Sequence, residues 1–345
     1  MWKNALTVLL LVGLWSGLGW GSPALAEDAR TIATTELVAP SPNTPLKPGQ
    51  WIEGTDFERV QRPFTIQRLT ERVYWVEVAG YESTVVVGDQ GVMVIDAPCC
   101  GRVPTYLAAI RELTDLPVTT LVYSHYHLDH VAGAKEYLSD AESAGRSLRI
   151  VANRTTGAQI EKFGNKIPAP TELVSVPRGT FEFEGRKVVM GTPSTGHTID
   201  NSWILLEEDR VLHSVDLVHP GVLEFMNFGV AEDLDGYEKS VRELLTLEWD
   251  FLCAGHSNVG NQEDVQLVLD YVADIRRYTG QAMGSTEFQP FVQEGTIFYE
   301  WIAGFRDAVI DKTVSLMRPR WAQYTGFDVV IRSHAERMFF ETYLH

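Results

Sequence analysis

The sequence predicts a mixed α/β fold: a sandwich of two β-sheets with helices on its outer faces, followed by a helical C-terminal extension. Short apolar runs typical of buried strands alternate with amphipathic segments of helical period. This alternation recurs in two similar halves, which is typical of two packed sheets with outer helices. After about residue 279 the strand-like runs give way to helical spacing.

The first 26 residues have the order of a secretory signal. Lys3 precedes an apolar run over residues 5–19, and Ala24-Leu25-Ala26 forms a small-x-small cleavage site. An uncleaved membrane anchor is the alternative, but the run is shorter and richer in glycine than the roughly 20 residues of a spanning helix. We expect export to the periplasm or the extracellular space, without stable membrane insertion after cleavage. Residues 27–60 are proline-rich and lack apolar periodicity, which predicts a linker.

The globular domain is expected over residues 61–278. Runs rich in Val, Ile and Leu predict strands at residues 73–78, 84–87, 92–95, 118–124, 148–152, 211–215 and 251–254. Helical character is found at residues 104–113, 132–138, 234–247 and 264–277. In residues 279–345, Trp301, Phe305 and Val309 are among the apolar side chains with helical spacing. We expect these residues to form an extension packed on the domain, with a substrate lid as the alternative.

Charge and cysteine content narrow the function classes. The 29 Lys and Arg against 46 Asp and Glu give a formal charge of −17. An acidic surface repels phosphate backbones, so nucleic acid is not expected as a partner. Cys99, Cys100 and Cys253 are an odd number, which is not typical of a disulfide framework in an exported protein. The adjacent Cys99 and Cys100 are expected to be buried free thiols, with a vicinal disulfide as the alternative.

Residues 125–130 read His-Tyr-His-Leu-Asp-His and follow a buried strand directly. They therefore lie on a strand-to-helix loop, where a rigid scaffold can present side chains. Alternate side chains of an extended loop share a side, so His125 and His127 can bind one ion together. Asp129 and His130 then point toward a second position. A purely structural role is a poor explanation, because crowding four polar groups would not stabilise the fold.

Further metal-competent residues follow at the ends of predicted strands and in a glycine-containing loop. His197 lies in Gly196-His197-Thr198, Asp216 ends one strand, and Gly255-His256 end another.

With these residues in place, the chain resembles the metallo-β-lactamase fold superfamily over residues 65–275. The resemblance implies a four-layer αββα sandwich with two divalent metal ions at one edge. It assigns His125, His127 and His197 to one ion and Asp129, His130 and His256 to the other, with Asp216 bridging both. Zinc suits these nitrogen and oxygen ligands, and iron or manganese would also fit.

Asp216 favours one branch of the superfamily. The best-known β-lactamases carry Cys or Ser at the matching place, whereas Asp resembles the glyoxalase II and lactonase branch. Asp96 matches a structural Asp of the superfamily, and the Cys99-Cys100 pair that follows departs from the usual small-residue turn.

The predicted reaction is hydrolysis of a small ester, thioester, lactone or amide by a hydroxide that bridges the two ions. Asp129 would orient this nucleophile, and His219 could reach the substrate or act as a surface-loop residue. His213 and His334 are expected to be structural or unrelated to the site. The alternatives are a mononuclear iron oxidoreductase similar to persulfide dioxygenases, a β-lactamase, and a binding protein without activity. Substrate, native metal and oligomeric state are not readable from the sequence.

Overall fold

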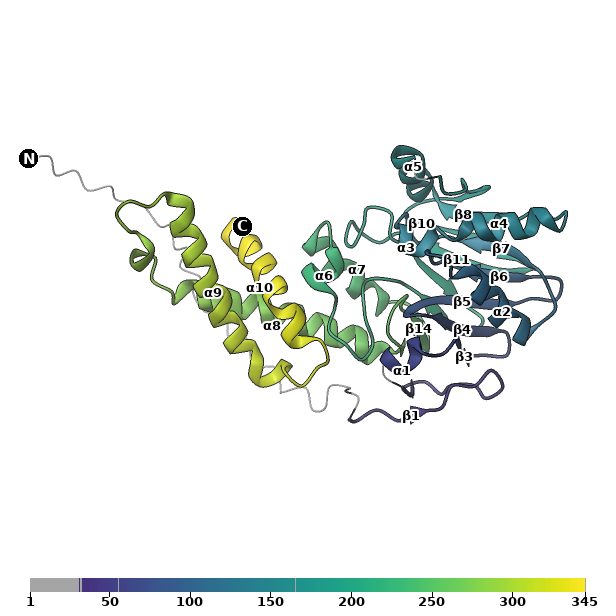
Figure 1. Cartoon of the computed structure of the whole chain (residues 1–345), viewed down its shortest axis with the longest axis horizontal. Coiled ribbons are helices and arrows are strands. Elements are labelled where there is room, and N and C mark those ends of the chain that lie inside the picture. Colours follow the sequence, from purple (N-terminus) through teal and green to yellow (C-terminus); the bar gives the residue numbers. More distant parts are fainter. Residues whose placement is uncertain (1–30, 32, 55, 165, 345) are drawn as a thin grey trace, which may run out of the picture.

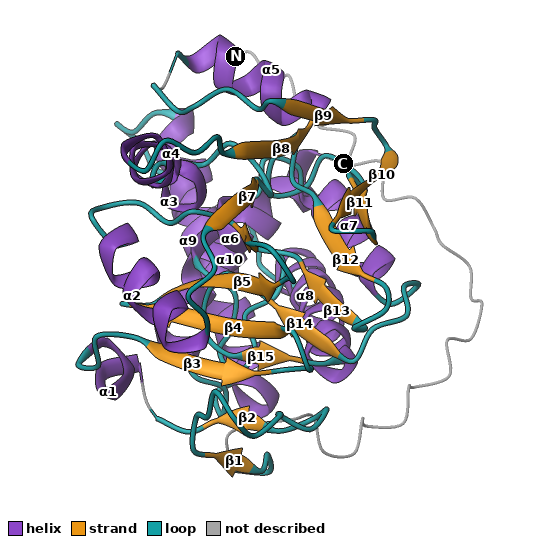
Figure 2. Ribbon diagram, turned by 90° about the vertical axis from the view of Figure 1, so that its right-hand side faces the viewer, coloured by secondary structure: helices purple, strands orange, loops and turns teal. Residues whose placement is uncertain are grey.

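Two β-sheets face each other in the computed structural model of the chain, and helices cover both outer faces (Figures 1 and 2). The structure describes residues 31, 33–54, 56–164 and 166–344. The predicted signal peptide lies outside the described residues. The expected αββα sandwich with a C-terminal helical extension is confirmed.

The first sheet has seven strands in sequence order. They are β3 (Thr65–Arg68), β4 (Val73–Val78), β5 (Tyr81–Val87), β6 (Val92–Ile95), β7 (Val118–Val122), β8 (Arg149–Asn153) and β9 (Glu172–Val174). Neighbours from β3 to β6 are antiparallel, and those from β6 to β9 are parallel. The carboxyl ends of β6, β7 and β8 therefore meet at one edge of the sheet.

The second sheet has six strands, also in sequence order. They are β10 (Arg178–Phe183), β11 (Arg186–Gly191), β12 (Trp203–Leu206), β13 (Val211–His213), β14 (Phe251–Cys253) and β15 (Val259–Gly260). Only β13 and β14 are parallel neighbours among these described strands. Their carboxyl ends open on the same loop cluster as those of β6 and β7, as the contacts between His125, His130 and Asp216 show.

Helices flank these sheets, and in Figure 2 α2 and α4 lie on one side of the strands and α7 on the other. In the domain they are α1 (Asp56–Val60), α2 (Val103–Leu113), α3 (Leu128–Val131), α4 (Ala134–Ser143), α5 (Arg154–Phe163), α6 (Met226–Val230) and α7 (Leu234–Leu244). The C-terminal part contains α8 (Gln262–Gly284), η1 (Gln289–Phe291), α9 (Phe298–Trp321) and α10 (Phe327–Leu344).

The period of two along the strands divides their buried side chains among three of the four apolar clusters in the described part of the chain, and the fourth lies within the C-terminal helices. On β4, Trp75 packs between the sheets, whereas Val76 packs under α2 and α4. The third core joins the outer face of the second sheet to α7, α8 and the C-terminal helices. Three apolar cores between four layers confirm the predicted architecture.

The proline-rich segment predicted as a linker packs on the domain from residue 36 to residue 52. It forms β1 (Leu37–Val38) and β2 (Trp51–Ile52), which pair in parallel. Trp51 and Ile52 are each 1% exposed, and the backbone N–H of Ile52 donates to the Asn258 side chain. The linker prediction is wrong for this segment, because Leu46, Trp51 and Ile52 bury apolar surface that a free linker would expose to water.

The C-terminal extension shares a core with the domain. Trp321, Phe327, Ile331 and Met338 are buried in the same cluster as Tyr237 and Val241 of α7. The boundary expected at residue 278 falls inside α8, which runs from the sandwich into the extension (Figure 1). None of the helices in the described part of the chain combines the length and the apolar character needed to cross a bilayer.

Cys99 and Cys100 form a vicinal disulfide, so the expectation of buried free thiols is wrong for this pair. Cys99 is half-buried and Cys100 is exposed, since the turn after β6 lies at the surface. Cys253 is free and buried in β14.

Candidate metal centre

The predicted ligands come from five separate places in the fold and meet at one edge of the sandwich. His125 and His127 follow β7, while Asp129 and His130 lie in the short helix α3. The other three come from the loop between β11 and β12 and from the ends of β13 and β14, and they are His197, Asp216 and His256. The structure thus brings together all seven residues predicted from the sequence.

The Asp216 carboxylate lies at the centre of this cluster. Its Oδ2 is 3.2 Å from the Nε2 atoms of both His130 and His197 and 3.5 Å from that of His125. Its Oδ1 is 3.5 Å from Nε2 of His256. One carboxylate therefore faces four imidazole rings from different elements, which is the position required of a bridging ligand.

The potential ligand atoms fall into two groups. Within each, they lie within 4.8 Å of one another: His125, His127, His197 and Asp216 form the first group, and Asp129, His130 and His256 the second. These are the sets that the family resemblance implies. Nitrogen and carboxylate donors at such spacing suit zinc and related divalent ions.

The outer nitrogen of four imidazole rings is bound to an acceptor, which tests whether the site fits a metal. Nδ1 of His197 lies 2.6 Å from the carbonyl of Gly229, and Nδ1 of His256 lies 3.1 Å from that of Gly80. Nδ1 of His130 lies 3.1 Å from Asp96 Oδ2. Because a carbonyl or carboxylate oxygen only accepts, each Nδ1 carries a proton and each Nε2 faces the cluster, where it is the atom available to a metal.

His125 follows the same logic through Ser124. The Ser124 hydroxyl donates to Asp96, so its oxygen accepts from Nδ1 of His125 at 3.0 Å. Burial and the neighbouring His130 and His197 lower the pKa of His125 well below its usual range, so the ring is neutral. The Nε2 atom of His125 is buried without a hydrogen-bond partner among the described residues, and that of His130 faces only carboxylates, with Asp216 Oδ2 at 3.2 Å. A buried acceptor left in this state is costly unless it binds an ion, so these residues fit a metal.

Asp96 connects the outer nitrogens into a network beneath the cluster. Its carboxylate accepts hydrogen bonds from the backbone N–H and hydroxyl of Ser124, from His130 and from Nε2 of His213. Burial opposes ionisation, but the bonds from His130 and His213 outweigh it and hold the pKa of Asp96 well below its usual range. His213 is therefore structural, as predicted, because it holds Asp96 and does not face the cluster.

Asp96 and Asp216 both have left-handed backbone, with φ of 65° and 63°. Each follows a strand of one sheet, β6 or β13, and turns the chain so that its carboxylate reaches inward. Asp tolerates this conformation better than most residues. Such strain persists where the surroundings determine it, and it is common at functional sites.

A cavity of about 570 Å³ opens over the cluster. Its polar wall includes Asp129 and His219, together with the buried pair Arg59 and Glu77. Its apolar wall consists of Tyr81, Val222, Leu223, Phe225, Val230 and Val330. The site therefore has room for a small substrate with an apolar body above polar groups.

His219 faces this cavity as predicted, and it pairs with a residue that the sequence analysis missed. Its Nδ1 lies 2.5 Å from Oε1 of the buried Glu224. Burial alone would lower the pKa of His219, but the Glu224 carboxylate outweighs burial and raises it. The His219 ring also stacks on that of His256, with centroids 5.6 Å apart. No motif around Glu224 indicates this pairing, because it depends on how the loop after β13 folds back.

Comparison with known proteins agrees with this geometry. The profile of the Metallo-beta-lactamase superfamily matches residues 79–256, which is just over half of the chain. The chain belongs to this superfamily.

Two curated proteins and one solved structure are among those similar to the chain. The chain is 25% identical over 283 residues to 2,4-dinitroanisole O-demethylase subunit beta of Nocardioides sp. strain JS1661, covering 79% of this chain and 80% of that protein. It is 28% identical over 167 residues to the atrochrysone carboxyl ACP thioesterase of Aspergillus fumigatus, covering 48% of this chain and 47% of that enzyme. A metallo-beta-lactamase from Pontibacter korlensis has a TM-score of 0.51 at 19% identity, covering 60% of this chain and 97% of that structure.

Membership of the superfamily, hydrolytic relatives and the His and Asp cluster make the chain a metal-dependent hydrolase. The solved structure shows a likeness of fold alone, because its identity to the chain is 19% over 60% of the chain. The O-demethylase subunit matches a longer stretch than the 218 residues of 61–278, so that similarity extends beyond the sandwich domain.

Proposed function

We propose that this hydrolase holds two divalent metal ions, most suitably Zn²⁺, and cleaves a small ester, thioester, lactone or amide. The observation that carries the proposal is the Asp216 carboxylate, which lies within 3.5 Å of four imidazole nitrogens from both ligand groups. His125, His127 and His197 would hold one ion, and Asp129, His130 and His256 the other. The bridging carboxylate favours the glyoxalase II and lactonase branch.

Two ions held by these residues would supply a Lewis acid for the carbonyl oxygen and a nucleophilic hydroxide near neutral pH. Asp129 is half-exposed at the cavity floor, where its free carboxylate oxygen can accept a proton from the attacking water and orient it. His219 borders the same cavity and is held by Glu224. In this position its ring can donate a hydrogen bond to the departing group as the carbonyl carbon–heteroatom bond breaks.

The cavity supports a substrate with an apolar acyl or aromatic part. Tyr81, Phe225 and Val230 line the cavity, and Phe225 and Val230 are exposed. An apolar body could pack against these side chains while its carbonyl approaches Asp216 and Asp129, which line the same cavity. Because the O-demethylase subunit is similar over most of its length, aromatic methyl ethers belong among the substrates to be tested.

The test replaces His127 or Asp129 by Ala and measures metal content and hydrolysis of p-nitrophenyl acetate. We expect both variants to lose hydrolysis and to bind less metal, because each removes a ligand. Asp115→Ala serves as the control, since Asp115 is exposed and lies outside the cluster. Full turnover in both site variants would refute the proposed centre. One tightly bound iron with thiol-dependent oxygen uptake would favour the oxidoreductase alternative.

We also propose that the enzyme acts outside the cytoplasm. The order of charged, apolar and small residues in 1–26 supports this location, as does the disulfide between Cys99 and Cys100, because disulfides persist in oxidising compartments. Cell fractionation with N-terminal sequencing would test it. An intact Met1 on cytoplasmic protein would refute it.

A further inference from the structure

The segment 225–231, which contains α6, touches both the metal centre and the C-terminal helix α10. Its Gly229 carbonyl accepts the hydrogen bond from Nδ1 of His197 at 2.6 Å. Phe225 and Val230 of the same segment line the cavity. The conformation of this short segment therefore bears on the orientation of a ligand and on the shape of the substrate wall.

The backbone of this segment is in a left-handed conformation that most of its residues disfavour. Asn227, Phe228, Gly229 and Val230 have consecutive φ values of 57°, 55°, 63° and 56°. Only glycine takes this left-handed region without strain, and a β-branched valine takes it least readily. At Gly229 even a Cβ would approach the carbonyl of Asp216 to 3.0 Å. Contacts outside the segment must therefore hold it.

Three side chains on one face of α10 supply such contacts. The Asn227 N–H donates to the Ser333 hydroxyl at 2.7 Å, and Arg337 donates to the Ala231 carbonyl at 3.2 Å. His334 Nε2 lies 2.9 Å from the Phe225 carbonyl, which can only accept, so Nε2 carries the proton. The three bonds hold the left-handed turn just before it at Phe225, at its first residue Asn227 and just after it at Ala231.

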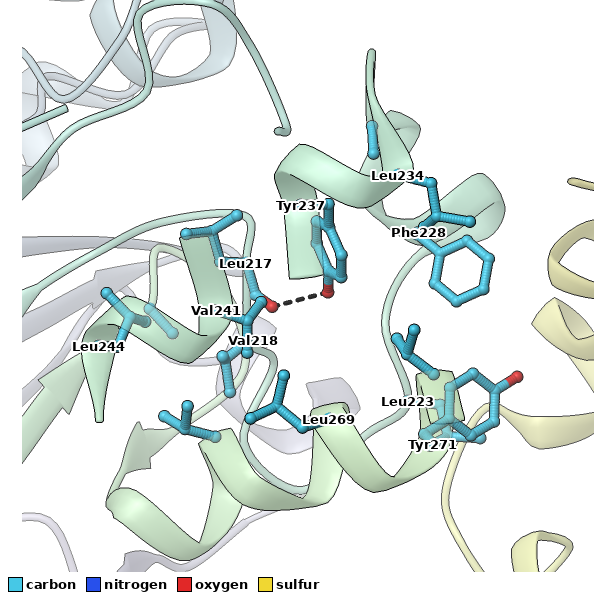
Figure 3. Packing of buried hydrophobic residues seen from close by; sticks show 14 of the residues in the cluster. Leu217, Val218, Leu223, Phe228, Leu234, Tyr237, Val241, Leu244, Leu269 and Tyr271 are labelled. Carbon is cyan, nitrogen blue, oxygen red and sulfur yellow. Dashed lines mark hydrogen bonds between the residues drawn. The ribbon is translucent and has the colours of Figure 1, made fainter. Parts of the chain in front are cut away.

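Aromatic packing fixes the same turn from below. The Phe228 ring stacks on the His334 ring, with centroids 4.3 Å apart. Figure 3 shows Phe228 pointing toward Leu223 and Tyr271 in the core beneath the segment. The Tyr271 hydroxyl lies 2.8 Å from Nδ1 of His334 and donates to it, because Nε2 already carries the ring proton.

We infer that α10 is part of the active site: Ser333, His334 and Arg337 are positioning residues that hold Gly229 against His197, and Val330 determines substrate size. This inference rests on the proposed function, since it takes His197 as a metal ligand. Val330 is one turn before His334 on α10 and lines the cavity beside Phe225. One helix of the extension thus acts on the ligand through the backbone of α6 and on the substrate directly.

The first arm of the test measures Zn²⁺ affinity by competition with a chromophoric chelator. His334→Leu removes the bond to the Phe225 carbonyl, and we expect roughly tenfold weaker Zn²⁺ binding by the folded protein. His334→Gln should restore much of the affinity, because its amide N–H can replace Nε2. Arg332→Gln is the control on the same helix, since Arg332 pairs with Asp311 on α9. A merely structural role would lower the melting temperature but leave Zn²⁺ affinity unchanged.

The second arm measures substrate size with p-nitrophenyl acetate and butyrate. Val330→Ala should change the ratio of the two KM values by at least about threefold, with Zn²⁺ affinity unchanged. Val329→Ala is the matched control, because Val329 is 66% exposed and does not line the cavity. Equal KM ratios in both variants would remove Val330 from the substrate wall.

A His197→Ala variant separates failure of this inference from failure of the proposed function. If His197→Ala keeps full Zn²⁺ affinity, the proposed centre is wrong. If it loses Zn²⁺ while His334→Leu and Ser333→Ala bind Zn²⁺ like the wild type, the role of α10 is overturned. Should His334→Leu fail to fold, Ser333→Ala decides, because it removes one bond from a side chain of the same helix.

Discussion

Asp96→Asn should weaken both the fold and the metal centre, although Asp96 faces away from the metal ligand atoms. The side chain is fully buried, and its Oδ2 accepts from the Ser124 hydroxyl, His130 and His213. Its Oδ1 accepts from the Ser124 N–H at 2.8 Å. Asn also tolerates a φ of 65°, so the substitution changes charge and hydrogen bonding with little backbone strain.

The magnitude follows from these four bonds. An Asn side chain has one acceptor oxygen, so its NH₂ group must face a donor on one side. At least one buried donor is left unpaired, which costs about 1–3 kcal/mol, and the remaining bonds lose the assistance of charge. We estimate about 3 kcal/mol in the free energy of unfolding, equivalent to roughly 4–5 °C in Tm for a chain of this length. Because His130 loses its orienting carboxylate, Zn²⁺ affinity should fall roughly 10–100-fold.

Thermal unfolding by circular dichroism and Zn²⁺ competition titrations measure the two effects. Asp89→Asn is the control, since Asp89 is exposed and its side chain pairs with Arg72. An exposed pair of this kind contributes about 0–1 kcal/mol. Wild-type Tm together with wild-type Zn²⁺ affinity in Asp96→Asn would refute the idea that this carboxylate orients the ligands.

Three further predictions concern packing and pH. Gly236→Ala should destabilise the protein, because the added Cβ would lie 1.3 Å from the Thr195 carbonyl oxygen. Gly280→Ala in α8 should stabilise the protein by about 0.5–1 kcal/mol, because its added Cβ meets no atom within 4 Å. Thermal unfolding of both variants should show changes in Tm of opposite sign. Trp51→Ala should lower the free energy of unfolding by about 3–5 kcal/mol, because Trp51 is buried. If chemical denaturation gave the wild-type midpoint, residues 36–52 would contribute no packing to the fold and would be a linker, as the sequence analysis expected. Burial lowers the pKa of His334 to about 4, so the unfolded chain binds more protons below pH 6.5 and stability falls as the pH drops from about 6.5 to 4. Full protonation of His334 would lower the free energy of unfolding by about 3 kcal/mol. If the free energy of unfolding of His334→Gln fell between pH 6.5 and 4 as steeply as that of the wild type, this explanation would be wrong.

Much of the fold was predictable because its signals are local. The run 73–78 matches β4, and 92–95 matches β6, since buried strands need continuous apolar side chains over a few residues. The ligands in residues 125–130 were predictable for the same reason, as four metal-competent side chains within six positions are a local pattern. The proline-rich segment misled the prediction, because a lack of periodicity does not exclude packing by two short strands.

The sequence by itself determined the order of the elements, the αββα class and the seven residues of the candidate centre. Only the tertiary structure decided which groups orient those residues: the carbonyls of Gly80 and Gly229, the Asp96 network, and the pairing of His219 with Glu224. It also placed Val330 and His334 of α10 beside the cavity and α6, more than 100 residues from Phe225. Local patterns report what a residue can bind, whereas an orienting contact depends on which distant backbone atoms packing brings within hydrogen-bond distance.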